Sequence, residues 1–298
     1  MPEKPVCKPK RPRPWRPGQR IDTRFTVIGV IDDGGPEPVY IVWNHETWCP
    51  MALKRMTSPE RARREGGVLD RLAHPNVVRC LGVVEPGYLL MEFLEGPTLS
   101  AFYKAQPGGR MRLSDALRTG VHIAAALHTA HERGYIHCDV KPRNVIVTPG
   151  GRPVLFDFGL ARERAEWSEA RLEGTDPYMP PEQCRQQPLS PATDVYALGV
   201  SLFEMITGKP PFPDGTKKRE FPQLSMQPRR LRSLRPGAPR ALEDLIGACL
   251  SAEAADRPAL GEVMVGLAGA IRGGPPMWPA GFSPEAKPRG SKALEATG

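Results

Sequence analysis

The sequence feature that most constrains this chain is a polar cluster between two apolar runs, the stretch His137–Asn144 with the sequence HCDVKPRN. Two short β-type runs follow it, residues 145–147 and 154–156, and a turn rich in proline and glycine joins them. Two strands joined by such a turn predict a β-hairpin. The tripeptide Asp157–Gly159 follows the second strand directly, so the hairpin brings it beside the polar cluster.

The polar residues at these strand ends suit chemistry on a charged group. Asp139, Asn144 and Asp157 supply two carboxylates and an amide oxygen, and hard cations such as Mg²⁺ prefer oxygen ligands. The carboxylate that does not bind metal is suited to accept a proton, and Lys141 to neutralise developing negative charge. The cluster therefore combines metal ligands, a base and a cation.

The two motifs, HCDVKPRN and DFG, resemble the catalytic loop and the metal-binding loop of eukaryotic-type (Hanks-type) serine/threonine protein kinases. A lone DFG is a weak signal, but both motifs in order and at hairpin spacing are a specific one. The resemblance covers about residues 24–272. It implies an α+β fold of two lobes, with a small β-rich N-lobe that carries one helix and a larger, mainly helical C-lobe. Arg-, Ala-, Pro- and Gly-rich composition favours a bacterial member.

The resemblance also implies an activity, the transfer of the γ-phosphate of ATP to Ser or Thr hydroxyls of protein substrates. Lys54, in the run MALK, is expected to orient the α- and β-phosphates, and Glu65 to pair with Lys54. Asp139 is expected to orient the substrate hydroxyl and accept its proton, while Lys141 neutralises charge on the transferred group. Asn144 completes this expected catalytic set.

The cofactors implied are ATP and Mg²⁺, with Mn²⁺ as an alternative ion, and the implied metal ligands are Asn144 and Asp157. Met91 takes the gatekeeper position, and the backbone near Glu92 and Leu94 forms the hinge that hydrogen-bonds adenine. The full set of expected nucleotide-binding residues is Lys54, Gly34, Val39, Ala52, Met91, Glu92, Leu94, Ile146 and Asp157.

The turn that corresponds to the glycine-rich loop of the family departs from its pattern. Only Gly34 matches a motif glycine, because Asp32 and Glu37 occupy the other two places. Acidic side chains repel a triphosphate, and Pro36 and Pro38 have no N–H to donate to it. We therefore expect weakened, but not abolished, nucleotide affinity.

The helix expected to carry Glu65 begins with Ser58 as N-cap and Pro59 at its first position. Gly66 and Gly67 lie inside it, each at a cost of about 1 kcal/mol. The link from Lys54 to this helix is also short. The resulting hypothesis is a loosely held helix that acts as a control point.

Two further stretches bear on regulation and substrate docking. Cys138 stands where the family has an arginine that pairs with a phosphorylated residue, so activity should depend less on phosphorylation, for example of Ser168. Residues 174–182 resemble the substrate-docking end of the activation segment, in which Thr175 is expected to contact the catalytic loop. Asp194 is expected to steady that loop, and residues 182 and 257 are expected to form an ion pair.

Composition sets the domain boundaries and the expected partners. The expected units are a basic, Pro-rich disordered arm (1–20), the N-lobe with hinge (21–94), the C-lobe (95–272) and a disordered tail (273–298). Residues 1–20 hold seven Lys or Arg and one Glu, so six of the eight net positive charges lie there. An anionic partner for the arm is therefore one interpretation, whereas the folded part indicates no nucleic-acid surface.

The sequence also bears on compartment. Six scattered cysteines without a Cys-x-x-Cys pair are typical of reduced thiols in a cytoplasmic protein. No apolar run reaches the ~18 residues of a membrane helix.

Three other readings stay open beside the active kinase. One is a pseudokinase or scaffold whose degenerate turn, with Asp32 and Glu37, no longer binds ATP productively. Another is a small-molecule phosphotransferase, against which Lys141 and the loop of Thr175 argue. The last is nucleic-acid binding through residues 1–20.

Overall fold

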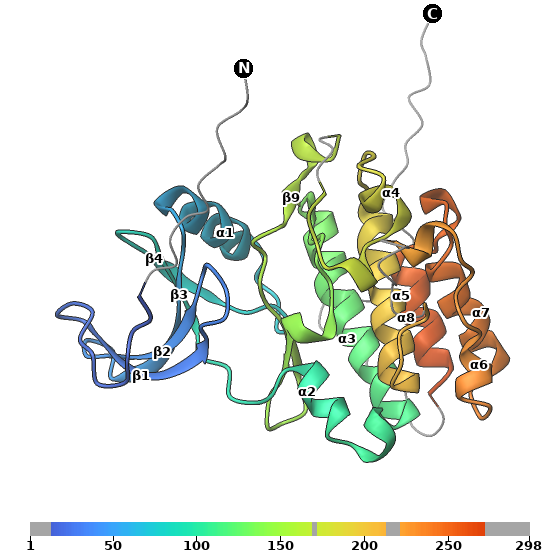
Figure 1. The fold of residues 1–298 in the computed structure, drawn as a ribbon, viewed down its shortest axis with the longest axis horizontal. Coiled ribbons are helices and arrows are strands. Elements are labelled where there is room, and N and C mark those ends of the chain that lie inside the picture. The colour runs from blue at the N-terminus through green and yellow to red at the C-terminus, as the bar shows by residue number, and fades with distance from the viewer. Residues whose placement is uncertain (1–12, 169–171, 213–220, 272–298) are drawn as a thin grey trace, which may run out of the picture.

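The computed structural model describes residues 13–168, 172–212 and 221–271. Figure 1 shows two parts side by side, a sheet with helix α1 (Pro59–Arg71) and a larger group of helices. The two-lobed α+β fold expected from the sequence is confirmed. The expected tail, 273–298, and the first twelve residues of the expected arm lie outside the described residues.

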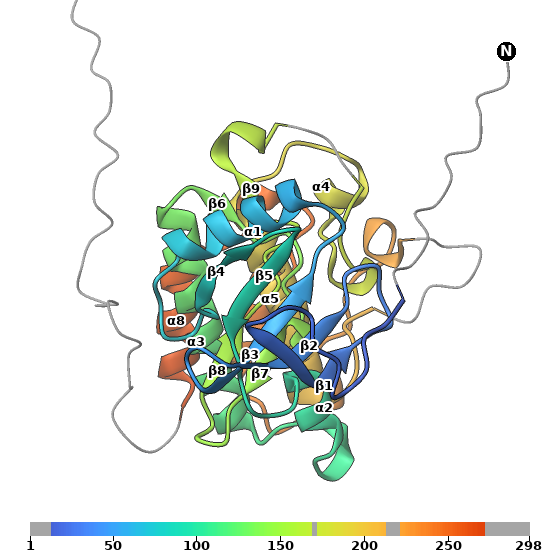
Figure 2. The same cartoon turned by 90° about the vertical axis from the view of Figure 1, so that its left-hand side faces the viewer.

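The small lobe is built on an antiparallel sheet with the strand order β1-β2-β3-β5-β4. Its strands are β1 (Phe25–Asp32), β2 (Val39–Asn44), β3 (Cys49–Arg55), β4 (Cys80–Val84) and β5 (Tyr88–Glu92). Helix α1 begins as predicted, because the Ser58 side chain accepts a hydrogen bond from the backbone N–H of Arg61 and Pro59 stands at the start of the helix. Figure 2 shows this helix against β4 and β5.

Both faces of the sheet are covered at β2, whose residues alternate between buried and half-buried. One face belongs to the core that α1 completes. The other face carries a separate apolar cluster, and Trp15, from the expected arm, packs against it. The Trp15 ring lies 4.9 Å from that of Tyr40 and 5.4 Å from that of Tyr88, and the N–H of Gly18 donates to the carbonyl of Val27 at 2.8 Å.

The large lobe is mainly helical. Its helices are α2 (Leu99–Lys104), α3 (Leu113–Glu132), α4 (Pro181–Cys184), α5 (Pro191–Thr207), α6 (Leu231–Leu234), α7 (Arg240–Cys249) and α8 (Leu260–Gly269). Four short strands, β6 (Tyr135–Ile136), β7 (Val145–Val147), β8 (Pro153–Leu155) and β9 (Arg162–Glu163), form two-stranded ladders, β6 with β9 and β7 with β8. Short 3₁₀ turns lie at 107–109, 142–144, 164–166, 176–178, 222–224 and 254–256.

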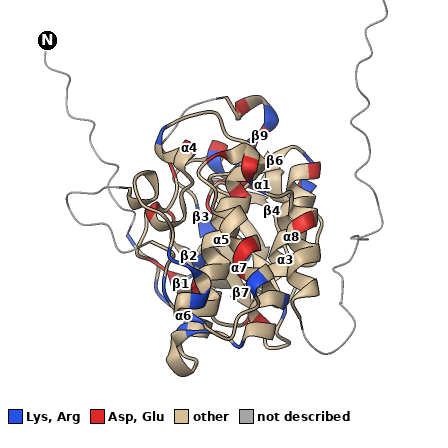
Figure 3. Cartoon of the chain, turned by 90° about the vertical axis from the view of Figure 1, so that its right-hand side faces the viewer, with Lys and Arg blue, Asp and Glu red and all other residues tan. Residues whose placement is uncertain are grey.

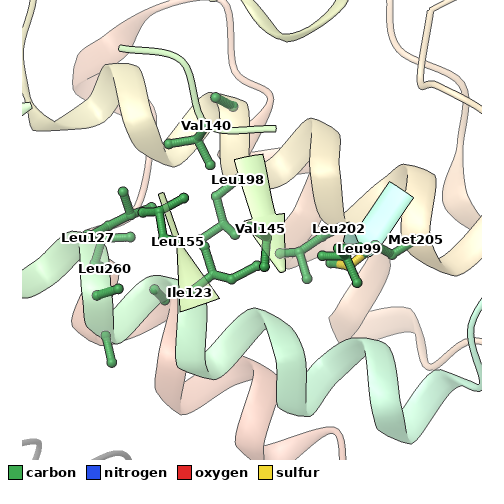
Figure 4. Close-up of a cluster of buried hydrophobic side chains, with 14 of the residues drawn as sticks. Leu99, Ile123, Leu127, Val140, Val145, Leu155, Leu198, Leu202, Met205 and Leu260 are labelled. Atoms are coloured by element: carbon green, nitrogen blue, oxygen red, sulfur yellow. The ribbon is translucent and has the colours of Figure 1, made fainter. Parts of the chain in front are cut away.

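The hairpin predicted after the polar cluster is the pair β7 and β8, which pair antiparallel with Val145 opposite Leu155. Figure 4 shows where it rests, since Val145 and Leu155 lie among apolar side chains of α3 and α5, including Ile123 and Leu198. Interiors of this kind are close-packed and have low compressibility. The polar cluster is therefore attached to the rigid centre of the large lobe.

The linker between the lobes runs from β5 to α2 along one edge of β7. The N–H of Val147 donates to the carbonyl of Pro97 at 3.0 Å, and Thr98 forms an isolated bridge with Ile146. Gly96 has a φ of 135°, and a Cβ there would overlap the carbonyl oxygen of Val147. Only glycine combines that backbone conformation with such a close approach.

The surface of the large lobe carries both signs of charge. Figure 3 shows Lys and Arg interspersed with Asp and Glu along the visible helices. Within the described ranges, no helix is both long enough and apolar enough to cross a bilayer.

Candidate active site

Asp194, a buried residue of α5, forms hydrogen bonds with the backbone of the polar cluster. Its carboxylate accepts hydrogen bonds from the N–H groups of His137 and Cys138, at 2.8 and 2.9 Å, and contacts Nε2 of His131 at 2.8 Å. Burial favours the neutral acid, but these donors outweigh it and lower the pKa of Asp194. The contact of Asp194 with the loop, expected from the sequence, is present.

Asp139 lies at the centre of a small hydrogen-bonded group. Its side chain accepts from Lys141 Nζ at 2.5 Å, from Thr175 Oγ1 at 2.8 Å and from Asn144 Nδ2 at 3.1 Å. Lys141 Nζ also donates to Thr175 Oγ1 at 2.6 Å. A carboxylate surrounded by a cation, an amide and a hydroxyl is suited to orient a further hydroxyl and to take its proton.

Lys54 connects the sheet, helix α1 and the DFG tripeptide. Its Nζ donates to both carboxylate oxygens of Glu65, at 3.0 and 2.9 Å, and to Oδ1 of Asp157 at 2.8 Å. Burial alone would lower the pKa of Lys54, but the two carboxylates outweigh it and raise the pKa. Despite the short link and the two glycines, Glu65 is 2% exposed in the structure. Whether α1 is loosely held in solution stays a prediction.

The two expected metal ligands lie at the ends of the hairpin strands. The N–H of Phe156 donates to the carbonyl of Asn144 at 2.9 Å, which fixes residues 144 and 157 relative to one another. Asn144 donates with its amide nitrogen to Asp139, so its amide oxygen is the atom suited to a metal. Among the described residues, no group of three or more His, Cys, Asp or Glu could hold a metal alone. This donor set fits an ion that phosphate oxygens help to bind.

Asp157 adopts an uncommon backbone conformation, with a φ of 63°. Its carboxylate is partly exposed. Burial raises the pKa of Asp157, but Lys54, His137 and Lys141 together outweigh burial and lower the pKa. The following Phe158 packs its ring 4.5 Å from the ring of His137. The DFG tripeptide is therefore fixed on both sides, by the lysine and by the polar cluster.

The expected adenine-binding residues gather in one apolar cluster. Ala52 lies opposite Met91 in the pairing of β3 with β5, and both are buried. Val39 and Ile146 pack against this cluster from β2 and β7, and Leu94 belongs to it. The backbone N–H of Glu92 donates to the carbonyl of Arg79 at 3.0 Å, and adenine binding at Glu92 and Leu94 stays a prediction.

The turn between β1 and β2 differs from the sequence-based expectation. Gly34 donates its N–H to Asp32 at 2.9 Å, within the turn itself. Glu37, expected only to repel phosphate, has definite partners: Oε1 accepts from Arg61 Nε at 2.7 Å and from Thr57 Oγ1 at 2.8 Å. Burial raises the pKa of Glu37, but these donors outweigh it and lower the pKa. Arg61 precedes Glu65 by one helical turn, and this spacing was the sequence signal that could have predicted a partner for Glu37.

The activation segment is tied to the large lobe by three side chains. Arg162, almost fully buried, pairs with Glu173 at 2.7 Å. Gln183 donates to the carbonyls of Glu173 and Cys138, at 3.1 Å for the second. Neither Glu173 nor Gln183 was predicted from the sequence, because no local pattern marks either residue.

Glu182 and Arg257 form the expected bidentate ion pair. The guanidinium nitrogens lie 2.7 and 2.8 Å from the two carboxylate oxygens, and both residues are buried.

Comparison with known proteins gives matches along most of the chain. The family model described as protein kinase domain matches residues 25–265. The serine/threonine-protein kinase PkaA of Streptomyces coelicolor is 37% identical over 70% of this chain and 39% of its own length. PrkC of Bacillus subtilis is 30% identical over 77% of this chain and 37% of its own length.

PknA of Mycobacterium tuberculosis is 30% identical over 94% of this chain and 70% of its own length. The chain thus spans less than two fifths of PkaA and of PrkC, but more than two thirds of PknA.

Proposed function

Because this chain belongs to the Hanks-type family of serine/threonine protein kinases, whose members use ATP with a divalent metal ion, we propose that it phosphorylates Ser and Thr hydroxyls of protein substrates. One observation carries the proposal. Lys54 contacts Glu65 and Asp157 together, at hydrogen-bond distances, although the three residues come from separate parts of the chain.

The residues take the following roles in this proposal. Lys54, held by Glu65, orients the α- and β-phosphates, and Asp157 and Asn144 hold the metal, which we propose to be Mg²⁺, with Mn²⁺ as the alternative. When bound, the metal supplies positive charge to the phosphate oxygens. Asp139 orients the acceptor hydroxyl and takes its proton.

Lys141 and Thr175 complete the site on the side of the acceptor. Lys141 neutralises charge on the transferred group. The hydrogen bonds of Lys141 and Asp139 to Thr175 support a protein substrate, because residues 174–182 then lie beside the acceptor position. Two sets of contacts support catalysis over the pseudokinase reading, that of Lys54 with Glu65 and that of Asp139 with Lys141 and Asn144.

The test is transfer of labelled phosphate from ATP and Mg²⁺ to a generic acceptor protein. We expect Asp139→Asn and Lys54→Met to reduce transfer at least about 100-fold, which corresponds to roughly 2.7 kcal/mol of transition-state stabilisation. Lys104→Met, at an exposed lysine of α2, is the matched control and should behave as wild type. Equal transfer in all four proteins would refute intrinsic catalysis.

Two expectations lie beyond what the described residues address. An anionic partner for residues 1–20 and a cytoplasmic location stay predictions. Removing residues 1–12 and comparing binding to heparin, an anionic probe, would test the first.

A further inference from the structure

Glu37 is the acidic residue that replaces a glycine at the end of the turn between β1 and β2. Its side chain is only 12% exposed, although the turn itself lies at the surface. One carboxylate oxygen binds Arg61 and Thr57, and the other lies 3.9 Å from Lys54 Nζ. The carboxylate therefore lies inside the site, beside the lysine proposed to bind phosphate.

Glu37 and a nucleotide make opposing demands on Lys54. The single positive charge of Lys54 already faces two carboxylates, Glu65 and Asp157, so the carboxylate of Glu37 adds to an existing excess of negative charge around the lysine. A phosphate that approaches Lys54 meets Glu37 within a few ångströms, and like charges at that distance repel strongly when they are partly desolvated.

Moving the Glu37 carboxylate away from an incoming phosphate would be costly. Turning its side chain into water would break its bonds with Arg61 and with Thr57, and it would leave the Arg61 guanidinium without this partner. Arg61 is a further cation on α1, and its guanidinium is paired with Glu37 instead of with a phosphate. The carboxylate thus acts twice, because it repels phosphate and it occupies Arg61.

We propose that Glu37 is the residue that sets the nucleotide affinity of this chain, and that it does so through the phosphates and not through adenosine. The inference rests on the proposed function, because it assumes that ATP binds at Lys54. It predicts that the chain discriminates against nucleotides in proportion to their phosphate charge.

The test is calorimetric titration of the whole chain with MgATP, MgADP and adenosine, for wild type and Glu37→Gln. Glutamine keeps the shape and an acceptor oxygen but removes the charge. We expect the affinity for MgATP to rise about tenfold, which is about 1.4 kcal/mol, with a smaller rise for MgADP. The affinity for adenosine should change less than about twofold.

Two further variants sharpen the result. Asp33→Asn removes an exposed charge from the same turn and should leave MgATP affinity within about twofold of wild type. Arg61→Gln frees the Glu37 carboxylate to act on Lys54 and should weaken MgATP binding. In the transfer assay, the KM for MgATP should fall in Glu37→Gln.

Each other outcome is decisive. Equal MgATP affinity in wild type and Glu37→Gln would overturn the inference alone. An equal gain for adenosine and MgATP, or a fall in kcat with unchanged nucleotide affinity, would assign Glu37 a structural role and overturn it as well. Uptake of no nucleotide by any protein, at millimolar concentration with Mg²⁺, would overturn the proposed function together with the inference.

Discussion

The two adjacent glycines of α1 should respond in opposite ways to the same substitution. A Cβ at Gly66 would lie 2.6 Å from a methyl group of Val83 and 3.3 Å from one of Leu89. A Cβ at Gly67 would meet nothing within 4 Å, since that residue faces solvent. Both residues are inside the helix, so they share the same backbone and differ only in surroundings.

The structure sets the size of each effect. Replacing glycine by alanine in a helix interior contributes about 0.8–1.0 kcal/mol of stability. At Gly67 nothing opposes this gain, so Gly67→Ala should raise the free energy of unfolding by about 1 kcal/mol. At Gly66 overpacking costs about 1–3 kcal/mol, so the net effect of Gly66→Ala should be a loss of up to about 2 kcal/mol.

The assay is urea unfolding followed by tryptophan fluorescence, with the two variants and wild type measured together. A gain of about 1 kcal/mol corresponds to a rise of roughly 2–4 °C in the midpoint of thermal unfolding. Hydrogen exchange of the α1 amides should slow in Gly67→Ala, if the glycines do loosen this helix. Equal effects of the two substitutions, or a loss of stability in Gly67→Ala, would refute the reasoning.

Three other predictions follow from the ion pairs and the activation segment. Glu182→Gln leaves the buried Arg257 without its counter-charge and should reduce the free energy of unfolding by about 3–5 kcal/mol, a loss that urea unfolding would detect or rule out. Asp194 has a lowered pKa in the folded chain, so its stabilising effect is present above about pH 4 and is lost as the pH falls below that value. The urea midpoint of wild type should therefore drop more steeply between pH 5 and pH 3, roughly, than that of Asp194→Asn, and equal slopes would contradict this. Ser168→Ala should keep phosphate transfer within about twofold of wild type, because Glu173 already supplies a negative charge to Arg162, and a tenfold loss, roughly, would count against it.

Much of the site was predictable because its determinants are local. The polar cluster, the hairpin and DFG lie within 23 consecutive residues, 137–159, and hairpin geometry alone brings their ends together. The start of α1 was predictable for the same reason, since Ser58 and Pro59 act within one helical turn. Predicting the role of Lys54 required the family pattern, because lysines at strand ends are commonly just exposed to solvent.

The rest depends on contacts between distant segments. Glu37 reads as an exposed turn residue, and only the packing of α1 against the sheet brings Arg61 to it. Gln183 bridges two backbone carbonyls that meet only after the large lobe has folded. Trp15 lies in a basic, Pro-rich stretch that predicts disorder, and the aromatic rings that receive it come from β2 and β5.

The close passage of Gly96 beside β7 has a mechanical consequence. Backbone bonds at Pro97 and Thr98 fasten this end of the linker to the large lobe, and Gly96 lies in close contact with the backbone of Val147. We therefore expect any opening or closing of the lobes to use torsions earlier in the linker, at residues 93–95. This hinge would include Leu94, so the backbone expected to hydrogen-bond adenine would also set the angle between the two lobes.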